Sequence, residues 1–67
     1  MKVRDLQTKM VFTDVRIVGL GEIYTAEVHY VGNCYSIPWN HYVCDMQVSS
    51  INCYVFDGKP YVVISVW

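Results

Sequence analysis

Apolar side chains recur with helical spacing at the start of the chain, between Val3 and Met10. Val3, Leu6 and Met10 stand at positions i, i+3 and i+7, so one face of a helix there would be apolar and the other polar. A helix of about two turns is marginal on its own. We therefore expect this short helix to lie against another element, a sheet.

Further along the chain the pattern changes to the alternation of apolar and polar residues that is typical of half-buried strands. Gly19–Glu22 contains two glycines and predicts a hairpin loop between the first two strands, and Gly32-Asn33 ends the second. Pro38 predicts a loop over Cys34–His41, with one helical turn after the proline. The predicted strands cover Thr13–Val18, Ile23–Val31, a segment that begins after Tyr42 and ends at Phe56, and Tyr61–Trp67.

Asp57-Gly58 is the strongest hairpin signal in the chain, and it fixes a register that can be checked. A two-residue turn at this position pairs Tyr54 with Tyr61, Cys53 with Val62, and Ile51 with Ile64. Both faces of the hairpin are then apolar, and one short helix can cover only one of them. We expect the other face to meet a second subunit or a ligand; the alternative is that the loop over Cys34–Tyr42 folds back onto it.

These elements predict a single domain over residues 1–67 in the α+β class, with a short N-terminal helix packed on a four-stranded antiparallel β-sheet (meander). Hydrophobic residues make up 54% of the chain and charged residues 16%, below the globular average of about 25% charged. So little charge cannot cover a small surface. We therefore expect a homo-dimer or higher oligomer.

The 5 basic and 6 acidic residues give a net charge of -1 without any Lys/Arg cluster, so nucleic acid is not an expected partner. The longest uncharged stretch, Val28 to Cys44, is broken by glycine, proline and asparagine, so no membrane segment is expected. Lys2, Arg4 and Asp5 precede any sustained apolar run, which argues against a secretory leader. The predicted location is cytoplasmic.

The residues that could carry chemistry are scattered. The odd set Cys34, Cys44 and Cys53 favours free thiols over a disulfide framework. A metal site would need Cys34, His41 and Cys44 with His29, which is not the spacing of a common zinc module, so we expect no metal and no cofactor. No paired carboxylates and no phosphate loop before a helix are visible, so an enzyme is not expected.

The remaining signal is aromatic, because tyrosine and tryptophan combine a large contact area with a polar tip. Pro38 stiffens the backbone beside Trp39, which either presents this ring to a partner or turns it inward to plug the open end of the sheet. The predicted interface residues are Trp39, Tyr42, Tyr54, Phe56, Tyr61, Val63 and Trp67.

An opening Val3-Arg4-Asp5-Leu6, alternating strands, the Ser36-Ile37-Pro38-Trp39 loop and a closing Val62-Val63-Ile64 strand resemble a loose group of small uncharacterised proteins of Gram-positive bacteria and their phages. The resemblance implies a phage or prophage setting. Small proteins of this kind often act by binding, either blocking a host defence protein or sequestering its nucleotide signal. No functional residue is carried over from the group.

The expected function is that of a small non-enzymatic binding protein, an inhibitor or adaptor that occupies a partner surface, such as that of a host defence protein. The alternative is a homo-oligomeric binder of a small molecule, a nucleotide signal, with bases stacked on aromatic rings. A cation beside those rings would favour the alternative, because it could meet a phosphate. The candidates are Arg4, Lys9, Arg16 and Lys59.

Overall fold

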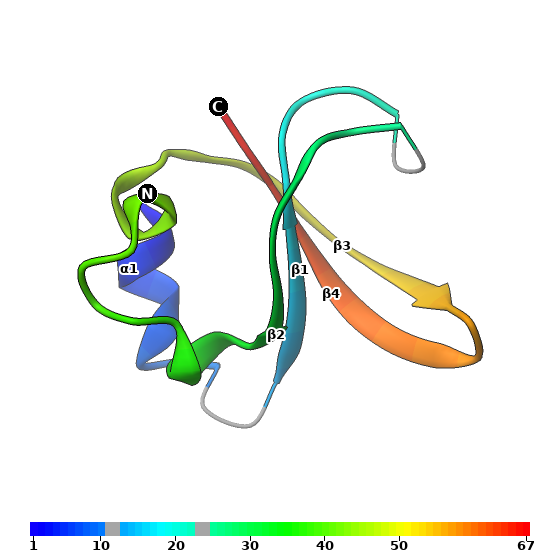
Figure 1. Ribbon diagram of the computed structural model, residues 1–67, viewed down its shortest axis with the longest axis horizontal. Coiled ribbons are helices and arrows are strands. Elements are labelled where there is room, and N and C mark those ends of the chain that lie inside the picture. The colour runs from blue at the N-terminus through cyan, green and yellow to red at the C-terminus, as the bar shows by residue number, and fades with distance from the viewer. Residues whose placement is uncertain (11–12, 23–24) are drawn as a thin grey trace.

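The computed structural model describes residues 1–10, 13–22 and 25–67 and shows one short helix and a four-stranded sheet (Figure 1). These elements confirm the α+β class. In chain order the elements are helix α1 (Val3–Gln7), strands β1 (Asp14–Val18) and β2 (Val28–Asn33), the 3₁₀ helices η1 (Cys34–Ser36) and η2 (Tyr42–Asp45), and strands β3 (Val48–Phe56) and β4 (Lys59–Val66). None of the helices in the described ranges is of a length that could cross a bilayer.

The sheet is mixed, so the predicted antiparallel meander is wrong. Its strand order is β2-β1-β4-β3, and β4 runs parallel to β1 while the other neighbours are antiparallel. The cause is the connection over residues 34–47, which crosses one face of the sheet instead of reversing in a short turn. The β3–β4 hairpin therefore lies on the side of β1 opposite β2, with β4 next to β1.

The hairpin itself matches the sequence prediction. Asp57 and Gly58 have φ values of 50° and 78°, the left-handed conformation that a two-residue type I′ turn requires. The three predicted partners are observed: Tyr54 with Tyr61, Cys53 with Val62, and Ile51 with Ile64.

Two predicted elements are longer than the observed ones. Helix α1 ends at Gln7 rather than Met10, because the N–H groups of Lys9 and Met10 both bond to the Leu6 carbonyl and close the last turn. Strand β2 begins at Val28 rather than Ile23. A turn precedes it, in which the N–H groups at positions 25 and 26 both donate to the carbonyl of residue 22. The first residues of the predicted strand, 23 and 24, lie outside the described ranges.

The loop regions also differ in detail from expectation. Gly32 and Asn33 belong to β2 and pair with β1, so the strand does not end before them. A helical turn does follow Pro38, at η2, and a second short helix, η1, precedes the proline. Polar side chains explain both starts: the Asn33 carboxamide accepts from the Tyr35 N–H, and the His41 ring accepts from the Val43 N–H.

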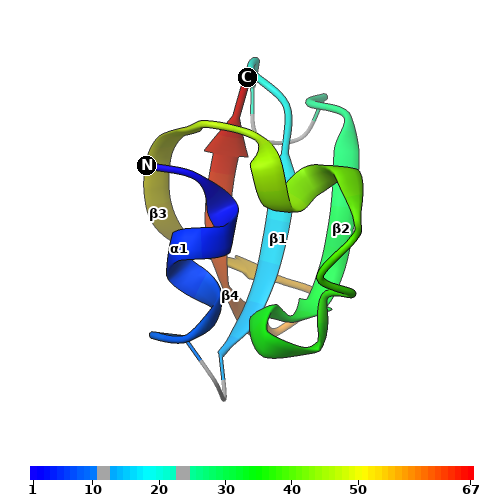
Figure 2. The same cartoon turned by 90° about the vertical axis from the view of Figure 1, so that its left-hand side faces the viewer.

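The core lies between one face of the sheet and a layer formed by α1, η1 and η2 (Figure 2). The segment over residues 34–46 therefore packs on the helix side, and the prediction that it could fold over the opposite face is wrong. The segment is held there because it contributes four side chains to the same core as the helix. The core consists of Val3, Leu6, Val15, Ile17, Cys34, Ile37, Val43, Cys44, Ile64 and Val66.

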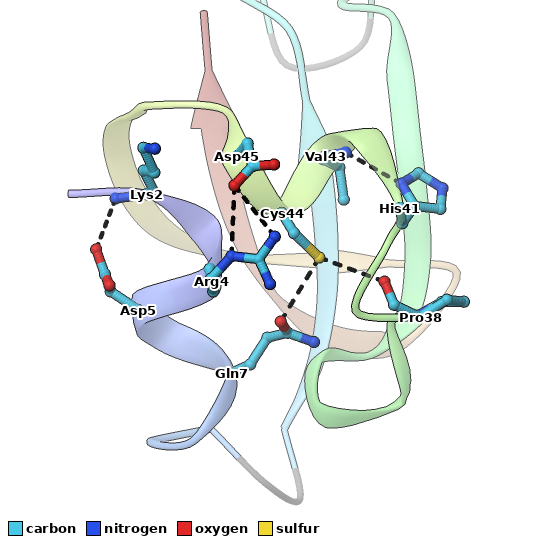
Figure 3. Close-up of polar contacts among 9 residues, drawn as sticks. All are labelled: Lys2, Arg4, Asp5, Gln7, Pro38, His41, Val43, Cys44 and Asp45. Carbon is cyan, nitrogen blue, oxygen red and sulfur yellow. Dashed lines mark hydrogen bonds and ion pairs between the residues drawn. The ribbon is translucent and has the colours of Figure 1, made fainter.

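Gln7 ties the helix to this segment (Figure 3). Its Nε2 donates to the carbonyl oxygens of Ile37 (3.0 Å) and Cys34 (3.4 Å), and its Oε1 accepts from the Cys44 thiol (3.5 Å). The same thiol reaches the Pro38 carbonyl at 3.4 Å. One side chain thus binds two carbonyl groups at η1 and the thiol of a residue in η2.

Candidate functional site

The sheet face turned away from α1 gathers aromatic side chains. Val15 and Ile17 of β1 point into the core, so Arg16 between them points to the other face. The strand register places Val63 of β4 beside Arg16. Side chains alternate between the two faces of a sheet, so Tyr61 of β4 and its neighbours Tyr54 and Phe56 of β3 lie on the same face as Val63. We call this surface the aromatic face; it consists of Arg16, Tyr54, Phe56, Tyr61 and Val63.

The rings of the aromatic face meet at Phe56, which also contacts Arg16. The Arg16 guanidinium carbon lies 4.5 Å from the centroid of the Phe56 ring. Phe56 meets Tyr61 edge to face at 6.0 Å, and Tyr54 lies 6.4 Å from Phe56. A guanidinium over an aromatic face gains electrostatic attraction from the ring quadrupole. The arrangement holds several large side chains in place without a covering layer from the helix.

Lys59 extends the charge pattern at the end of this face. Its Nζ lies 2.9 Å from the Asp14 carboxylate and 5.3 Å from the centroid of the Tyr61 ring. The hydrogen bond to Asp14 raises the pKa of Lys59 above its ordinary value, with a further contribution from the charge of Asp14. The lysine charge is therefore already neutralised by a neighbour.

The members of the aromatic face differ in accessibility. Val63 is 1% exposed, so it offers a partner almost no surface. Tyr54 is 40% exposed and stands on the edge strand. The Arg16 Nε is buried, and no described residue accepts its hydrogen bond. The sequence named Arg16 only as one of four candidate cations; the strand order, which brings β4 beside β1, shows that it joins the aromatic residues.

Tyr42 lies on a different surface, at the edge of the sheet beside β2. Tyr42 bonds to the His29 ring through its hydroxyl, with 2.9 Å between Oη and Nδ1, and stacks on His41 at 4.6 Å. Trp39 is 76% exposed, so it does not plug the sheet. We call this second group, His29, His41 and Tyr42, the histidine–tyrosine cluster; Trp39 stands two residues before His41 in the chain.

Trp67 belongs to neither group by contact. It follows β4, donates its N–H to the Gln47 carbonyl at 3.2 Å, and has an exposed side chain. The structure thus brings together Tyr54, Phe56, Tyr61 and Val63 of the predicted residues and separates Trp39 and Tyr42 from them.

The thiols and the cavities limit the chemistry that this chain offers. Cys34 and Cys44 are buried, and burial raises the pKa of both thiols, which lowers their nucleophilicity. Within the described ranges no group of three or more potential metal ligands comes together. A cavity of about 390 Å³ lies beside the hairpin, lined by Thr13, Asp14, Cys53, Lys59, Pro60, Tyr61 and Val62.

Comparison with protein families, with curated proteins and with solved structures finds no match for this chain.

Proposed function

We propose that this chain is a non-enzymatic binding protein that acts as an inhibitor or adaptor by covering a partner protein with its aromatic face. The observation that carries the proposal is the ring cluster centred on Phe56, which contacts Arg16, Tyr54 and Tyr61 on the sheet face opposite the helix layer. Arginine and tyrosine are among the residue types that contribute most to protein interfaces. The partner class suggested by the sequence resemblance is a host defence protein.

Rigidity favours this use of the face. Tyr54, Phe56 and Tyr61 project from paired strands, and ring contacts restrain them before any partner arrives. Side chains that are already ordered lose little conformational entropy on binding. The same rings spread over a loop would lose more.

The alternative, a binder of a nucleotide signal, is supported by cations beside the rings but lacks a cavity of sufficient size on the aromatic face. Arg16 and Lys59 do lie beside aromatic rings, as a phosphate site would need. The cavity on the aromatic face, however, measures about 160 Å³, whereas pockets for small molecules usually span roughly 300 to 1,000 Å³. The larger cavity beside the hairpin contains Lys59 already paired with Asp14. Binding of a protein surface therefore fits the charges and sizes better.

The test compares two exposed aromatic residues from the two surfaces. Tagged protein captures its partner from a Gram-positive host lysate, and the affinity of the purified pair is then measured for wild type, Tyr54→Ala and Trp39→Ala. We expect Tyr54→Ala to weaken binding by about 2 kcal/mol or more, roughly 30-fold, which is the level of an interface hot spot. Trp39→Ala is expected to bind and melt like wild type, because Trp39 is 76% exposed and outside the aromatic face.

Full binding by Tyr54→Ala together with loss of binding by Trp39→Ala would instead assign partner binding to the surface of Trp39 and the histidine–tyrosine cluster. Binding that is unchanged in both variants would reject both surfaces. Thermal melts of each variant separate a lost contact from a lost fold.

A further inference from the structure

Strand β3 forms an edge of the sheet, and most of that edge has no strand beside it in the described ranges. Of the described residues, only the first ones of the chain pair with it on its outer side. The Val48 N–H donates to the Met1 carbonyl at 2.7 Å, and Lys2 forms an isolated bridge with Gln47. Past this point the β3–β4 hairpin projects away from the helix layer (Figure 1).

Both ends of the strand indicate which backbone groups point outward. At the turn, Phe56 and Lys59 flank a two-residue type I′ loop and form the hydrogen-bonded pair that closes it. The next pair, Val55 with Pro60, must then be a wide pair, which agrees with the missing N–H of proline. Alternation from there directs the N–H and C=O groups of Ile51, Cys53 and Val55 away from β4.

The start of the strand gives the same result. Gln47 accepts from the Trp67 N–H and so faces β4, while Val48 donates outward to Met1. The bulge between Val48 and Ser50 inserts one residue and shifts the alternation by one. Counting onward from the bulge again places the backbone groups of Ile51 and Cys53 on the outer side.

This part of the edge lacks the usual protection against strand pairing. Natural edges are blunted by charged residues, prolines or bulges. Here the bulge and the Met1–Lys2 segment protect only the start of β3, and the strand contains no charged residue. Val55 is 63% exposed, which is unusual for an apolar residue on an open edge.

We propose that the open edge of β3 pairs with the same edge of a second copy, antiparallel and about a two-fold axis at Cys53. The outward groups of Ile51, Cys53 and Val55 are symmetric about Cys53, so each copy offers the donors and acceptors that the other lacks, about six hydrogen bonds in all. Ile51 of one copy lies opposite Val55 of the other, and Asn52 opposite Tyr54. Like charges are not opposed anywhere in this pairing.

Charge at the two ends favours a second copy over an unrelated strand. Lys2 lies at the start of the edge and Asp57 at its end. The proposed register places Phe56 of the second copy opposite Ser50, so that the turn residue Asp57 comes near the bulge and the Met1–Lys2 segment, and an acidic end meets a basic one. The two-fold axis is perpendicular to the sheet and leaves both aromatic faces on the same side. This inference does not depend on the proposed function, since partner binding uses the face and dimerisation uses the edge.

The first test compares two single variants, each of which introduces one lysine on a different edge strand of the sheet. Sedimentation equilibrium at about 100 µM, a concentration at which weak strand-edge contacts are populated, is expected to give twice the chain mass of 7.8 kDa for wild type. Val55→Lys is expected to sediment as a monomer, because a lysine opposite Ile51 loses its hydration in the pair. Val31→Lys, which places the charge on the other edge strand, β2, beside Arg16, should remain a dimer.

The second test reads the register by cross-linking with a short bismaleimide. Wild type is expected to cross-link through Cys53, since the other thiols are buried, and Cys53→Ser should abolish the product. In the Cys53→Ser background, a mixture of Ile51→Cys and Val55→Cys chains should cross-link. Neither variant should cross-link alone. In a dimer of one variant, the cysteines of the two copies lie about four residues, or roughly 13 Å, apart along the paired strands.

Three outcomes would overturn the inference: a monomeric wild type at this concentration, a dimer lost in Val31→Lys but kept in Val55→Lys, or cross-linking of Ile51→Cys chains with themselves. The cross-linking result stands even if Val55→Lys fails to fold. Partner binding by a monomeric variant would leave the proposed function intact.

Discussion

At the residue scale, the three cysteines show how position decides chemistry. Cys34 and Cys44 are buried in the core beneath α1, whereas Cys53 lies on the exposed edge strand. Burial raises the pKa of Cys34, and the neighbouring Cys44 raises it further. The sequence favoured free thiols for all three but contained no signal that would rank their exposure, because ranking requires knowing which strand is at the edge.

Thiol alkylation at about pH 8, near the ordinary thiol pKa, is expected to distinguish the cysteines. Cys53 should react quickly, and Cys34 and Cys44 only at the rate of unfolding, since the reagent needs an accessible thiolate. Mass spectrometry of the labelled peptides gives the rates. Rapid labelling of Cys34 in the folded protein would contradict the core described above.

The raised thiol pKa of Cys34 also predicts a pH dependence of stability. The folded state holds this proton to a higher pH than the unfolded chain does, so the unfolding free energy is unaffected at low pH. It should fall as the pH rises above about 8.5, the ordinary value for a thiol. Urea unfolding at several pH values measures this slope. Cys34→Ala should reduce the slope.

At the element scale, local signals were sufficient for the hairpin and insufficient for the connection before it. Asp57-Gly58 determines a turn type, and the turn type determines the register of β3 and β4. The path over residues 34–47 depends instead on isolated apolar residues finding a core formed by distant strands. Neither residue spacing nor turn chemistry indicates on which face of the sheet this segment packs. The parallel pairing of β1 and β4 could therefore not be predicted.

The attachment of α1 to this connection is expected to depend on Gln7. Gln7→Ala removes the side-chain donor to the Ile37 carbonyl, and it takes one of two partners from the Cys34 carbonyl and from the Cys44 thiol. The unfolding free energy should fall by about 1 to 3 kcal/mol. Lys9→Ala, on an exposed residue just past the helix, should change it by less than about 0.5 kcal/mol. Chemical denaturation of both variants gives the comparison, and equal losses would argue against the network.

At the scale of the whole molecule, composition predicted exposed apolar surface but not its location. Tyr54, Phe56 and Tyr61 could be assigned to one face from the hairpin register alone. Arg16 could not be added, because its contact with Phe56 depends on the order of strands across the sheet. The edge position of β3 could not be predicted either, since a meander places the third strand between two others. The mixed order instead places β3 outermost.

An edge-paired dimer makes stability depend on protein concentration, because association favours the folded state by mass action. A tenfold rise in concentration adds about 1.4 kcal/mol per dimer, or about 0.7 per chain, which for a domain of this size raises the melting temperature by roughly 3 to 6 °C. Wild type is expected to show this rise in calorimetry over a tenfold series. Val55→Lys should melt at one temperature throughout, because its edge cannot pair, while Val31→Lys should follow wild type. A wild-type melting temperature that stays constant across the series would mean that the edge of β3 remains open in solution, and the apolar residues on it would then be available to a different strand.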